Sequence, residues 1–419
     1  MFKQPDTHHA SHGPATGDGS NVAADTFMGW AIAKGSHCLC PVTFEPRPMG
    51  KADVDVAIRY SGICGSDIHA IDKIDCSQGC EGGASVVWND KTVPGHEIAG
   101  IVIKAGPEAK FKVGERVGAG VLVGACLNCK ECNGGNEQLC KKAVLSYATP
   151  IRHDEGDKTT PIFGGFANRV RLNSDFVYCI PQEIELEEAA TLMCSGLTAY
   201  TALRRHGAGP NTAVGVMGIG SLGHLTLQFA KAMGCKTILA LNEELVSCED
   251  CLKLGATKCF CNLRETSSRQ QLLSHDRRES LDLLVVCSFE VTTNWHDLLH
   301  LMKPRGTIVM MAMPPGTEVP LVLPTPILVR HEIGVVGSFQ GGRREMREMF
   351  DFVIQHKIHP WTVKRPMAEI NDALDCVKKH KVCYSMVLEV PETTEGFEAE
   401  RTTTKLKQAL EEEVQQLEV

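Results

Sequence analysis

Apolar residues follow two different patterns along the chain, and the change between them divides the sequence. Up to about residue 190, short β-type runs such as VDVAIRY (residues 54–60) and EIAGIVI (97–103) alternate with glycine and proline turns, which indicates a strand-rich domain. From about residue 213, apolar runs alternate with helical segments: AVGVMG, SLGHLTLQFAKAMG, KTILAL, then LDLLVVC, GTIVMMA and EIGVVGS. This alternation predicts an α/β fold with a parallel sheet covered by helices on both faces.

The two ends of the chain differ from this folded part. Residues 1–26 are rich in His, Gly, Asp, Ser and Thr and have hardly any apolar period, so we expect a disordered arm. After residue 338, a helical MREMFDFVIQHKI and a strand-like CYSMVLEV complete the folded part. From Glu392 the sequence is charged, and four apolar residues at helical spacing predict a solvated or partner-packed amphipathic helix: Leu406, Leu410, Val414 and Leu417.

Composition narrows the class of protein. A chain of 419 residues favours about two domains. A net charge of −8 and a pI near 6.1 argue against nucleic-acid binding, which usually needs concentrated Lys and Arg. No apolar run approaches the roughly 20 residues that cross a bilayer, and the first residues lack the pattern of a signal peptide. We therefore expect a cytosolic protein that binds no membrane.

Four of the 19 cysteines lie in one short segment, CLNCKECNGGNEQLC. In a reducing compartment cysteines are metal ligands, catalytic groups or free thiols rather than disulfides, and their spacing decides which. Four thiolates from one loop make a closed tetrahedral site that suits zinc and organises the loop. An iron–sulfur cluster is the alternative, but its bacterial ferredoxin run ends in a different spacing and in Cys-Pro. The segment therefore predicts a structural zinc bound by Cys126, Cys129, Cys132 and Cys140.

A second constellation is scattered through the sequence. SGICGSDIH, VPGHEIAG and LMCSGLTAY contribute Cys64, Ser66, Asp67, His69, His96, Glu97 and Cys194. Each residue alone could be an ordinary core thiol or turn residue. Two cysteines and one histidine, however, are a ligand set of catalytic zinc, which keeps its fourth position open. Such a neutral ligand set would leave the metal electrophilic enough to polarise a carbonyl.

The third motif is GIGSLG, which follows a predicted strand and opens a predicted helix. Gly218 permits the tight turn, Gly220 allows a pyrophosphate to approach the backbone, and Gly223 allows the helix to pack closely on the strand. In this context the motif predicts a dinucleotide-binding site.

Taken together, these motifs resemble the zinc-dependent medium-chain alcohol dehydrogenases, and within them the cinnamyl-alcohol dehydrogenase branch. VPGHEIAG, VGERVGAG, the four-cysteine segment, LMCSGLTAY, GIGSLGHLTLQFAKAMG and VVGSF match in order between about Phe27 and Val390. The resemblance implies a GroES-like catalytic domain over residues 27–190 and 339–391, with a zinc lobe at 126–140. It also implies a Rossmann domain over 191–338, a separate tail over 392–419, and a homodimer.

The resemblance also assigns roles to individual residues. Cys64, His96 and Cys194 are implied to bind a catalytic zinc, giving two zinc ions per chain. Asp67 would orient His96, which is a common support for a metal-bound histidine, and Glu97 would be a nearby or alternate ligand. Ser66 and His69 would pass a proton to the product. The cofactor would be contacted by Thr198, Gly218, Gly220, Ser221, Leu222, Gly223, Asn242 and Ser338.

The sequence departs from the family between Cys64 and His96. It carries more residues there than the family usually has, including Cys76 and Cys80. These read as free loop thiols or as a redox pair, and the insertion makes it unsafe to carry over substrate-pocket residues.

We expect reversible interconversion of a primary alcohol and an aldehyde, with aldehyde reduction favoured by the branch. A polyol dehydrogenase with the same site is the alternative within enzymes. A non-catalytic protein that binds zinc and dinucleotide and senses redox state through its other cysteines is the alternative outside them.

The choice of nicotinamide cofactor depends on the end of the second strand. An NAD site normally has Asp or Glu there, and this chain has Asn242, which cannot repel a 2′-phosphate as a carboxylate does. Glu243 and Glu244 follow, however, and no Arg or Lys is near. We expect NADP(H), with NAD(H) not excluded.

Overall fold

A six-stranded parallel sheet forms the second half of the fold. Its strands stand in the order β14 (Lys258–Phe260), β13 (Thr237–Leu241), β12 (Ala213–Met217), β15 (Leu281–Val286), β16 (Met302–Met310) and β17 (Gly334–Gly337). Every neighbouring pair is parallel. The order reverses between β12 and β15, which is the point where open α/β sheets bind ligands at the carboxyl ends of their strands. The predicted parallel sheet is confirmed.

Both faces of this sheet are buried, which explains why its strands read as continuous apolar runs. Val214 and Val216 of β12 pack into one core cluster, whereas Met217 packs into the cluster on the opposite face. Ile238 and Leu239 of β13 likewise enter opposite clusters. The first cluster is covered by α4 (Leu197–Arg205), α5 (Ser221–Ala232), α6 (Cys248–Leu254) and α10 (Arg343–His356). The second is covered by α7 (Thr266–Leu272), α8 (Trp295–Leu299) and α9 (Thr325–His331).

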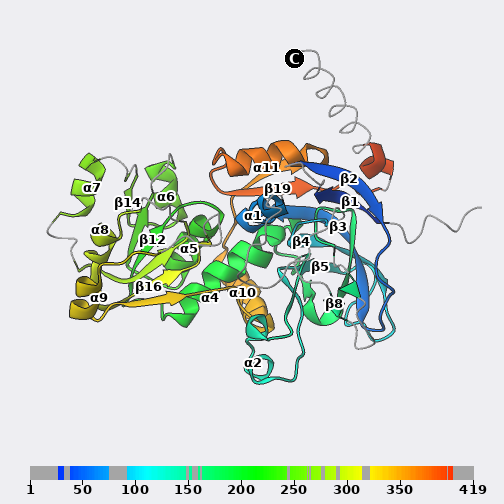
Figure 1. Cartoon of the computed structure of the whole chain (residues 1–419), viewed down its shortest axis with the longest axis horizontal. Coiled ribbons are helices and arrows are strands. Elements are labelled where there is room, and N and C mark those ends of the chain that lie inside the picture. The colour runs from blue at the N-terminus through cyan, green and yellow to red at the C-terminus, as the bar shows by residue number, and fades with distance from the viewer. Residues whose placement is uncertain are drawn as a thin grey trace, which may run out of the picture.

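A mostly antiparallel sheet builds the other half, which lies to the right in Figure 1. Its order is β11 (Tyr178–Cys179), β5 (Arg116–Ala119), β4 (Glu97–Ala105), β3 (Asp53–Ile63), β19 (Ser385–Glu389) and β18 (Thr362–Pro366), with β10 (Arg169–Asn173) also pairing with β3. Strand β3 pairs with β4 and β10, which precede the parallel sheet in the sequence, and with β19, which follows it. The C-terminal segment therefore returns to the first half after the parallel sheet is complete.

Smaller elements frame this second sheet. Three two-stranded ribbons pair β1 (Phe27–Ile32) with β2 (Leu39–Phe44), β6 (Leu122–Gly124) with β7 (Val144–Leu145), and β8 (Ile151–Arg152) with β9 (Thr159–Thr160). The helices are α1 (Gly65–Ile74), α2 (Lys130–Asn133), α3 (Leu186–Thr191) and α11 (Ile370–Lys378). A π-helical turn at Leu192–Gly196 joins α3 to α4.

The structure is a computed structural model that describes residues 27–32, 38–74, 92–147, 151–152, 159–160, 163–242, 246–261, 263, 266–274, 279–288, 293–313, 321–393 and 395–399. The predicted arm over 1–26, Cys76, Cys80, Glu243, Glu244 and the apolar residues of the tail from Leu406 lie outside them. Within the described part no helix is long and apolar enough to cross a membrane. Phe397, inside the predicted tail, is only 1% exposed and packs into the core of the antiparallel half, so packed structure extends beyond Glu392.

A buried histidine joins the two halves. His224 of α5 is fully buried; its Nε2 accepts the Trp361 N–H at 3.1 Å, so its Nδ1 must carry the proton that faces the Gly220 carbonyl at 3.1 Å. Burial lowers the pKa of His224 to about 4. The ring is therefore neutral in the folded protein.

Protonation of His224 is expected to destabilise the fold in acid. Its pKa is about 6.5 when unfolded and lower when folded, so the unfolded state binds more protons and stability falls as pH drops from about 6.5 toward about 4. Between about pH 7.5 and about pH 5 the loss should be about 2 kcal/mol. Urea unfolding at both pH values measures it, with His224→Gln as the non-titrating control. An equal pH dependence in the variant would contradict this role.

Candidate metal and cofactor site

Four potential metal ligands meet between the two halves. The ligand atoms of Cys64, His96, Glu97 and Cys194 all lie within 4.8 Å of one another. Cys64 directly follows β3 and His96 directly precedes β4; because these strands are antiparallel, with Gly62 opposite Glu97, the two loops meet. A Cβ at Gly62 would lie 2.0 Å from a Glu97 oxygen, so glycine is needed there to make room for that carboxyl group.

Cys194 reaches the same point from the π-helical turn. It is 9% exposed, and the turn interrupts an otherwise continuous helical segment between α3 and α4. Such single π turns are rare and occur frequently at functional sites. The turn therefore provides the local geometry that presents Cys194 beside Cys64 and His96.

A buried carboxylate holds His96 in one orientation. Asp67 is fully buried and accepts hydrogen bonds from the Cys64 N–H at 3.0 Å, the Gly95 N–H at 3.1 Å and the Tyr147 hydroxyl at 2.6 Å. It also lies 3.0 Å from His96 Nδ1. Because Asp67 is an acceptor, Nδ1 is the protonated nitrogen and Nε2 is the one that can bind a metal.

The electrostatics of this pair favour a cation at the site. Burial by itself would lower the pKa of His96, but the Asp67 carboxylate outweighs this effect and raises the pKa well above its ordinary value. Burial by itself would raise the pKa of Asp67, but the contacts with His96 and Tyr147 outweigh it and lower that pKa. A cation bound at Nε2 would take the place of the proton that Asp67 attracts.

Glu97 is the fourth member of the cluster and is buried at 1% exposure. Burial and the neighbouring Cys64 thiolate raise its pKa well above the ordinary value. The Ser195 hydroxyl donates to Oε1 of Glu97 at 3.3 Å. It also lies 2.8 Å from the Ser221 hydroxyl, which in turn lies 2.9 Å from the Ser385 hydroxyl, so the three hydroxyls form a chain. Ser221, assigned to the cofactor from the sequence, thus also links the glycine loop to the ligand cluster.

The two members of the predicted relay lie differently. The Ser66 hydroxyl is 3.3 Å from the Cys64 sulfur and 3.4 Å from His96 Nε2, so it faces the point where the ligand atoms converge. His69 lies one turn further along α1 and is half-buried. Within the described residues no hydrogen bond joins His69 to Ser66. The structure brings Ser66 to the cluster and leaves a gap in the relay before His69.

The donor set suits zinc. Two thiols, an imidazole and a carboxyl group are ligand types that zinc takes in tetrahedral sites. The contacts of Cys64 with Cys194 and His96 lower its pKa well below the ordinary value, although burial by itself would raise it. This shift favours the thiolate that metal binding requires.

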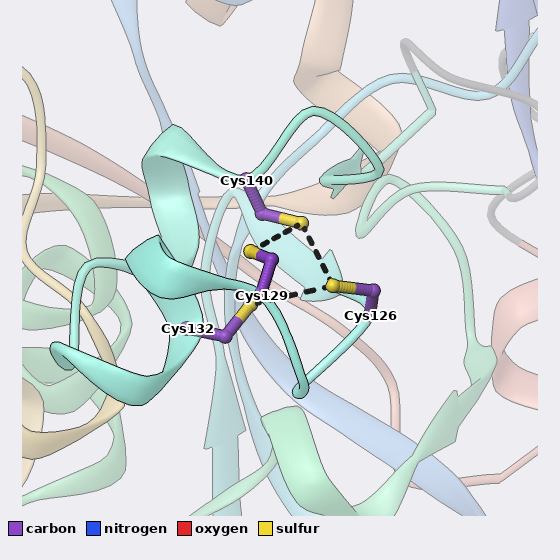
Figure 2. A group of neighbouring side chains, drawn as sticks. All are labelled: Cys126, Cys129, Cys132 and Cys140. Atoms are coloured by element: carbon purple, nitrogen blue, oxygen red, sulfur yellow. Dashed lines mark hydrogen bonds between the residues drawn. The ribbon is translucent and has the colours of Figure 1, made fainter.

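The four-cysteine segment forms a second cluster, shown in Figure 2. Its sulfurs are 3.5 Å apart for Cys126 and Cys140, 3.8 Å for Cys129 and Cys140, and 3.9 Å for Cys126 and Cys132. Zinc–sulfur bonds of about 2.3 Å in a tetrahedron place sulfurs about 3.8 Å apart. The Asn128 N–H lowers the pKa of Cys126 to about 6, and the Lys142 N–H points at the Cys140 sulfur at 3.3 Å. The lobe therefore fits a closed zinc site.

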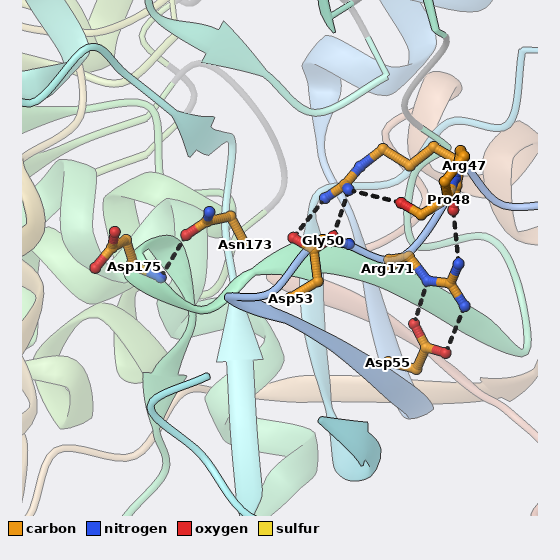
Figure 3. A network of polar contacts seen from close by, with 8 residues as sticks. All are labelled: Arg47, Pro48, Gly50, Asp53, Asp55, Arg171, Asn173 and Asp175. Atoms are coloured by element: carbon orange, nitrogen blue, oxygen red, sulfur yellow. Dashed lines mark hydrogen bonds and ion pairs between the residues drawn. The ribbon is translucent and has the colours of Figure 1, made fainter. Parts of the chain in front are cut away.

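The other end of β3 carries a buried ion-pair network, shown in Figure 3. Arg171 of β10 bonds both oxygens of Asp55 at 2.7 and 2.8 Å and also donates to the Arg47 carbonyl at 2.6 Å. Arg47 in turn pairs with Asp53. Breaking one partner of such a buried pair costs about 3–5 kcal/mol, so this network holds in place the strand that leads to Cys64.

The glycine loop has the backbone geometry of a phosphate-binding turn. Gly218 directly follows β12 with φ of +83°, and a Cβ there would lie 1.9 Å from the Ser288 hydroxyl. At Gly223 a Cβ would meet the Gly218 carbonyl at 2.0 Å, so the helix packs directly on the turn. A Cβ at Gly220 would meet nothing within 4 Å. The open side of the loop is therefore at Gly220, where a pyrophosphate could approach the backbone.

The remaining predicted cofactor residues lie around this loop. Asn242 follows β13, is 4% exposed, and its side-chain oxygen accepts the Ile219 N–H at 3.3 Å. Ser338 follows β17 and so lies at the same carboxyl edge of the parallel sheet as Gly218. Leu222 is partly buried against the core cluster under α5, and Thr198 is buried one helical turn after Cys194.

Sequence reasoning missed three side chains that support the cluster. They are Tyr147, which bonds Asp67, Ser195, which bonds Glu97, and Ser385, which ends the hydroxyl chain. Ser195 is next to a predicted ligand, which is a usable signal. Tyr147, with φ of +45°, and Ser385 have no such signal, since their contacts span 80 and 164 residues.

Comparisons with known proteins find two family domains in this chain. Residues 50–182 match the alcohol dehydrogenase GroES-like domain, and residues 221–355 match the zinc-binding dehydrogenase domain. The chain is 35% identical over 372 residues to cinnamyl alcohol dehydrogenase 2 of Rauvolfia serpentina, covering 87% of this chain and 95% of that protein. It is also 35% identical over 361 residues to mannitol dehydrogenase of Petroselinum crispum, covering 85% and 98%.

Among solved structures, the cinnamyl alcohol dehydrogenase of Helicobacter pylori complexed with NADP(H) superposes with a TM-score of 0.75 at 29% identity. The alignment covers 87% of this chain and 98% of that protein.

Proposed function

Since the chain belongs to the zinc-dependent medium-chain alcohol dehydrogenases, we propose that it reduces aldehydes to primary alcohols with NADPH at the site formed by Cys64, His96 and Cys194. The observation that carries this proposal is the convergence of these ligands with Glu97 within 4.8 Å, beside an oriented His96. Because of this ligand chemistry, we favour an alcohol dehydrogenase over a non-catalytic sensor.

The residues of the chain divide the work as follows. Zinc, when bound, supplies a Lewis acid that polarises a carbonyl group, and the nicotinamide supplies the hydride. Cys64, His96 and Cys194 hold the metal, and Asp67 keeps the His96 ring in place. Cys126, Cys129, Cys132 and Cys140 hold the second zinc and organise the lobe.

Proton supply falls to Ser66 and His69 in this proposal. The Ser66 hydroxyl already faces the ligand atoms, so it is placed to hydrogen-bond a substrate oxygen there and to pass it a proton. His69, on the next turn of α1, would exchange that proton with water.

The proposed function predicts a defined substrate and cofactor preference. Purified protein should reduce aromatic and aliphatic aldehydes with kcat/KM at least about tenfold higher than for oxidation of mannitol or sorbitol. It should also prefer NADPH to NADH by about tenfold, or about 1.4 kcal/mol, because Asn242 offers a neutral amide where NAD enzymes place a carboxylate. The likeness to an NADP(H)-bound relative supports the same preference.

One panel of aldehydes and polyols, run with both cofactors, measures these preferences. Faster turnover of polyols would favour the second candidate, a mannitol-type dehydrogenase, which the 35% identity to the Petroselinum crispum enzyme supports. A preference for NADH would contradict the cofactor assignment. It would direct attention to Glu243, and Glu243→Arg should then shift the preference toward NADPH.

His69→Ala is expected to slow turnover by about tenfold or more, most strongly near and below neutral pH, because the relay loses its outer proton donor. Zinc content should stay unchanged. The measurement is kcat as a function of pH, with His296→Ala, an exposed histidine of α8, as the matched control. An unaltered pH–rate profile would remove His69 from the mechanism.

The homodimer, the cytosolic location and the domain boundaries are also proposals. Strand β17 is the outer strand of the parallel sheet, and two valines that precede it in the sequence, Val322 ahead of α9 and Val329 within α9, are 73% and 72% exposed, which is compatible with pairing between two copies. Light scattering of the purified chain would establish the oligomeric state.

A further inference from the structure

Four cysteines that belong to neither zinc set gather where α6 meets β14. The sulfurs of Cys248 and Cys261 are 2.8 Å apart, those of Cys259 and Cys261 are 3.3 Å apart, and all three lie within 4.8 Å of one another. Cys251 is fully buried, and its thiol interacts with that of Cys259. In the described part of the chain, Cys248, Cys259 and Cys261 form the third group of side chains close enough to share one metal ion, and Cys251 is not a member of that group.

Local geometry and topology together bring these thiols to one place. Cys248 and Cys251 are three residues apart at the start of α6, so they share a helix face. Cys259 and Cys261 are two residues apart on β14 and just beyond it, so they point to the same side of the strand. Phe260 between them enters the core on the opposite face. Because β14 pairs with β13 and α6 follows β13, the two cysteine pairs face each other.

We propose that Cys248, Cys259 and Cys261 form a third metal site that takes a thiophilic divalent cation such as Zn²⁺. Three thiols converge here, against four in the 126–140 lobe. Cys251, whose thiol interacts with that of Cys259, lies outside this group of three and is the nearest candidate for a fourth donor. A disulfide between Cys248 and Cys261 would use two of the three thiols and would leave Cys259 at 3.3 Å from one of them. A shared metal uses all three.

The distances also indicate how this site differs from the lobe. Tetrahedral zinc needs sulfurs about 3.8 Å apart, so the 3.3 and 2.8 Å contacts must open by about 0.5 and about 1.0 Å. Cys248 is exposed at the start of its helix and can rotate outward. Cys261 must also give up the hydrogen bond that it donates to the Val246 carbonyl at 3.1 Å. Both costs make this site weaker than the lobe, so its metal should exchange with chelators.

A metal at this position would join α6 to β14 next to the cofactor-binding edge. Val246 and Ser247, which lead into α6, follow shortly after Asn242, and Ser247 caps the helix by accepting the Glu249 N–H at 3.1 Å. The inference does not depend on the substrate or on the direction of the reaction.

Metal counting tests the proposal. The full-length protein is reduced, loaded with Zn²⁺, passed through gel filtration and analysed for metal per chain, with and without a mild chelator. For the wild-type protein we expect about three zinc ions per chain, and about two after treatment with the chelator. For the double variant Cys248→Ser/Cys261→Ser we expect about two zinc ions per chain even without the chelator. Cys179→Ser, an exposed cysteine on β11, is the matched control and should keep three. Co²⁺ in the third site should give thiolate charge-transfer absorption that the double variant lacks.

The outcomes separate this proposal from the proposed function. Two zinc ions in the loaded wild-type protein, or a third ion that persists in the double variant, would overturn the third site. A disulfide between Cys248 and Cys261 recovered from protein that was never reduced would also overturn it, in favour of a redox pair. Loss of zinc from Cys194 or lobe variants reports on the proposed function and leaves this result unaffected.

Discussion

Cys194→Ala is expected to lower kcat by about 1000-fold or more while the protein stays folded. A metal Lewis acid contributes several kcal/mol of stabilisation to the developing charge, and about 4 kcal/mol corresponds to about 1000-fold in rate. Alanine leaves only Cys64, His96 and Glu97 around the ion. The variant should therefore lose about one chelator-resistant zinc ion per chain together with its activity.

Metal analysis and steady-state kinetics of the same preparation measure both effects. The matched control is Cys235→Ala, a buried cysteine of the parallel-sheet half that is 7% exposed and belongs to none of the thiol clusters. It should keep its zinc and most of its turnover. Full turnover in Cys194→Ala, or an unchanged zinc content, would show that Cys194 is a core thiol and would contradict its assignment as a zinc ligand.

Cys129→Ala is expected to have the opposite balance of effects: a large loss of stability and a smaller loss of turnover. The lobe has little apolar core of its own, so its zinc takes the place of hydrophobic packing. The lobe is also tied to α10, because Glu137 accepts from Arg343 Nε at 2.8 Å and from the Arg343 N–H at 3.2 Å. Loss of a structural metal belongs to the class of changes that cost more than about 4 kcal/mol, so Tm should fall by at least about 5 °C.

Thermal unfolding and metal content after chelator treatment test this prediction. The variant should retain one chelator-resistant zinc ion, and its kcat at low temperature should exceed that of Cys194→Ala by far. Lys130→Ala, at the next position of the lobe, controls for local surface changes. An unchanged Tm with two firmly bound zinc ions would contradict the structural role of the lobe.

Short-range patterns were sufficient to predict most of the fold. The alternation of apolar strands and helices after residue 213 predicted the parallel sheet, because a strand buried on both faces must be apolar at successive positions, as in Val216 and Met217. The spacing within CLNCKECNGGNEQLC predicted the lobe, since all four ligands lie in one loop. The glycines of GIGSLG predicted a close helix–strand contact, which the 2.0 Å clash of a Gly223 Cβ explains.

Long-range contacts were decided only by the tertiary structure. The local sequence does not predict that Tyr147 bonds Asp67 or that Ser385 ends a hydroxyl chain from Glu97. It also does not predict that Phe397, in a charged tail, enters the core. These contacts depend on how distant strands and loops pack. The resemblance named His69 as a relay residue, but it could not show that a gap separates His69 from Ser66.

The cysteines of CEDCLKLGATKCFC show the same division. Their spacing is present in the sequence, and by itself it predicts two thiols on a helix face and two on one side of a strand. Whether the pairs face each other or opposite sides of the sheet depends on the crossing from β13 through α6 to β14. Periodicity determines which side of each element a residue occupies, and only the packing of the elements determines what that side meets.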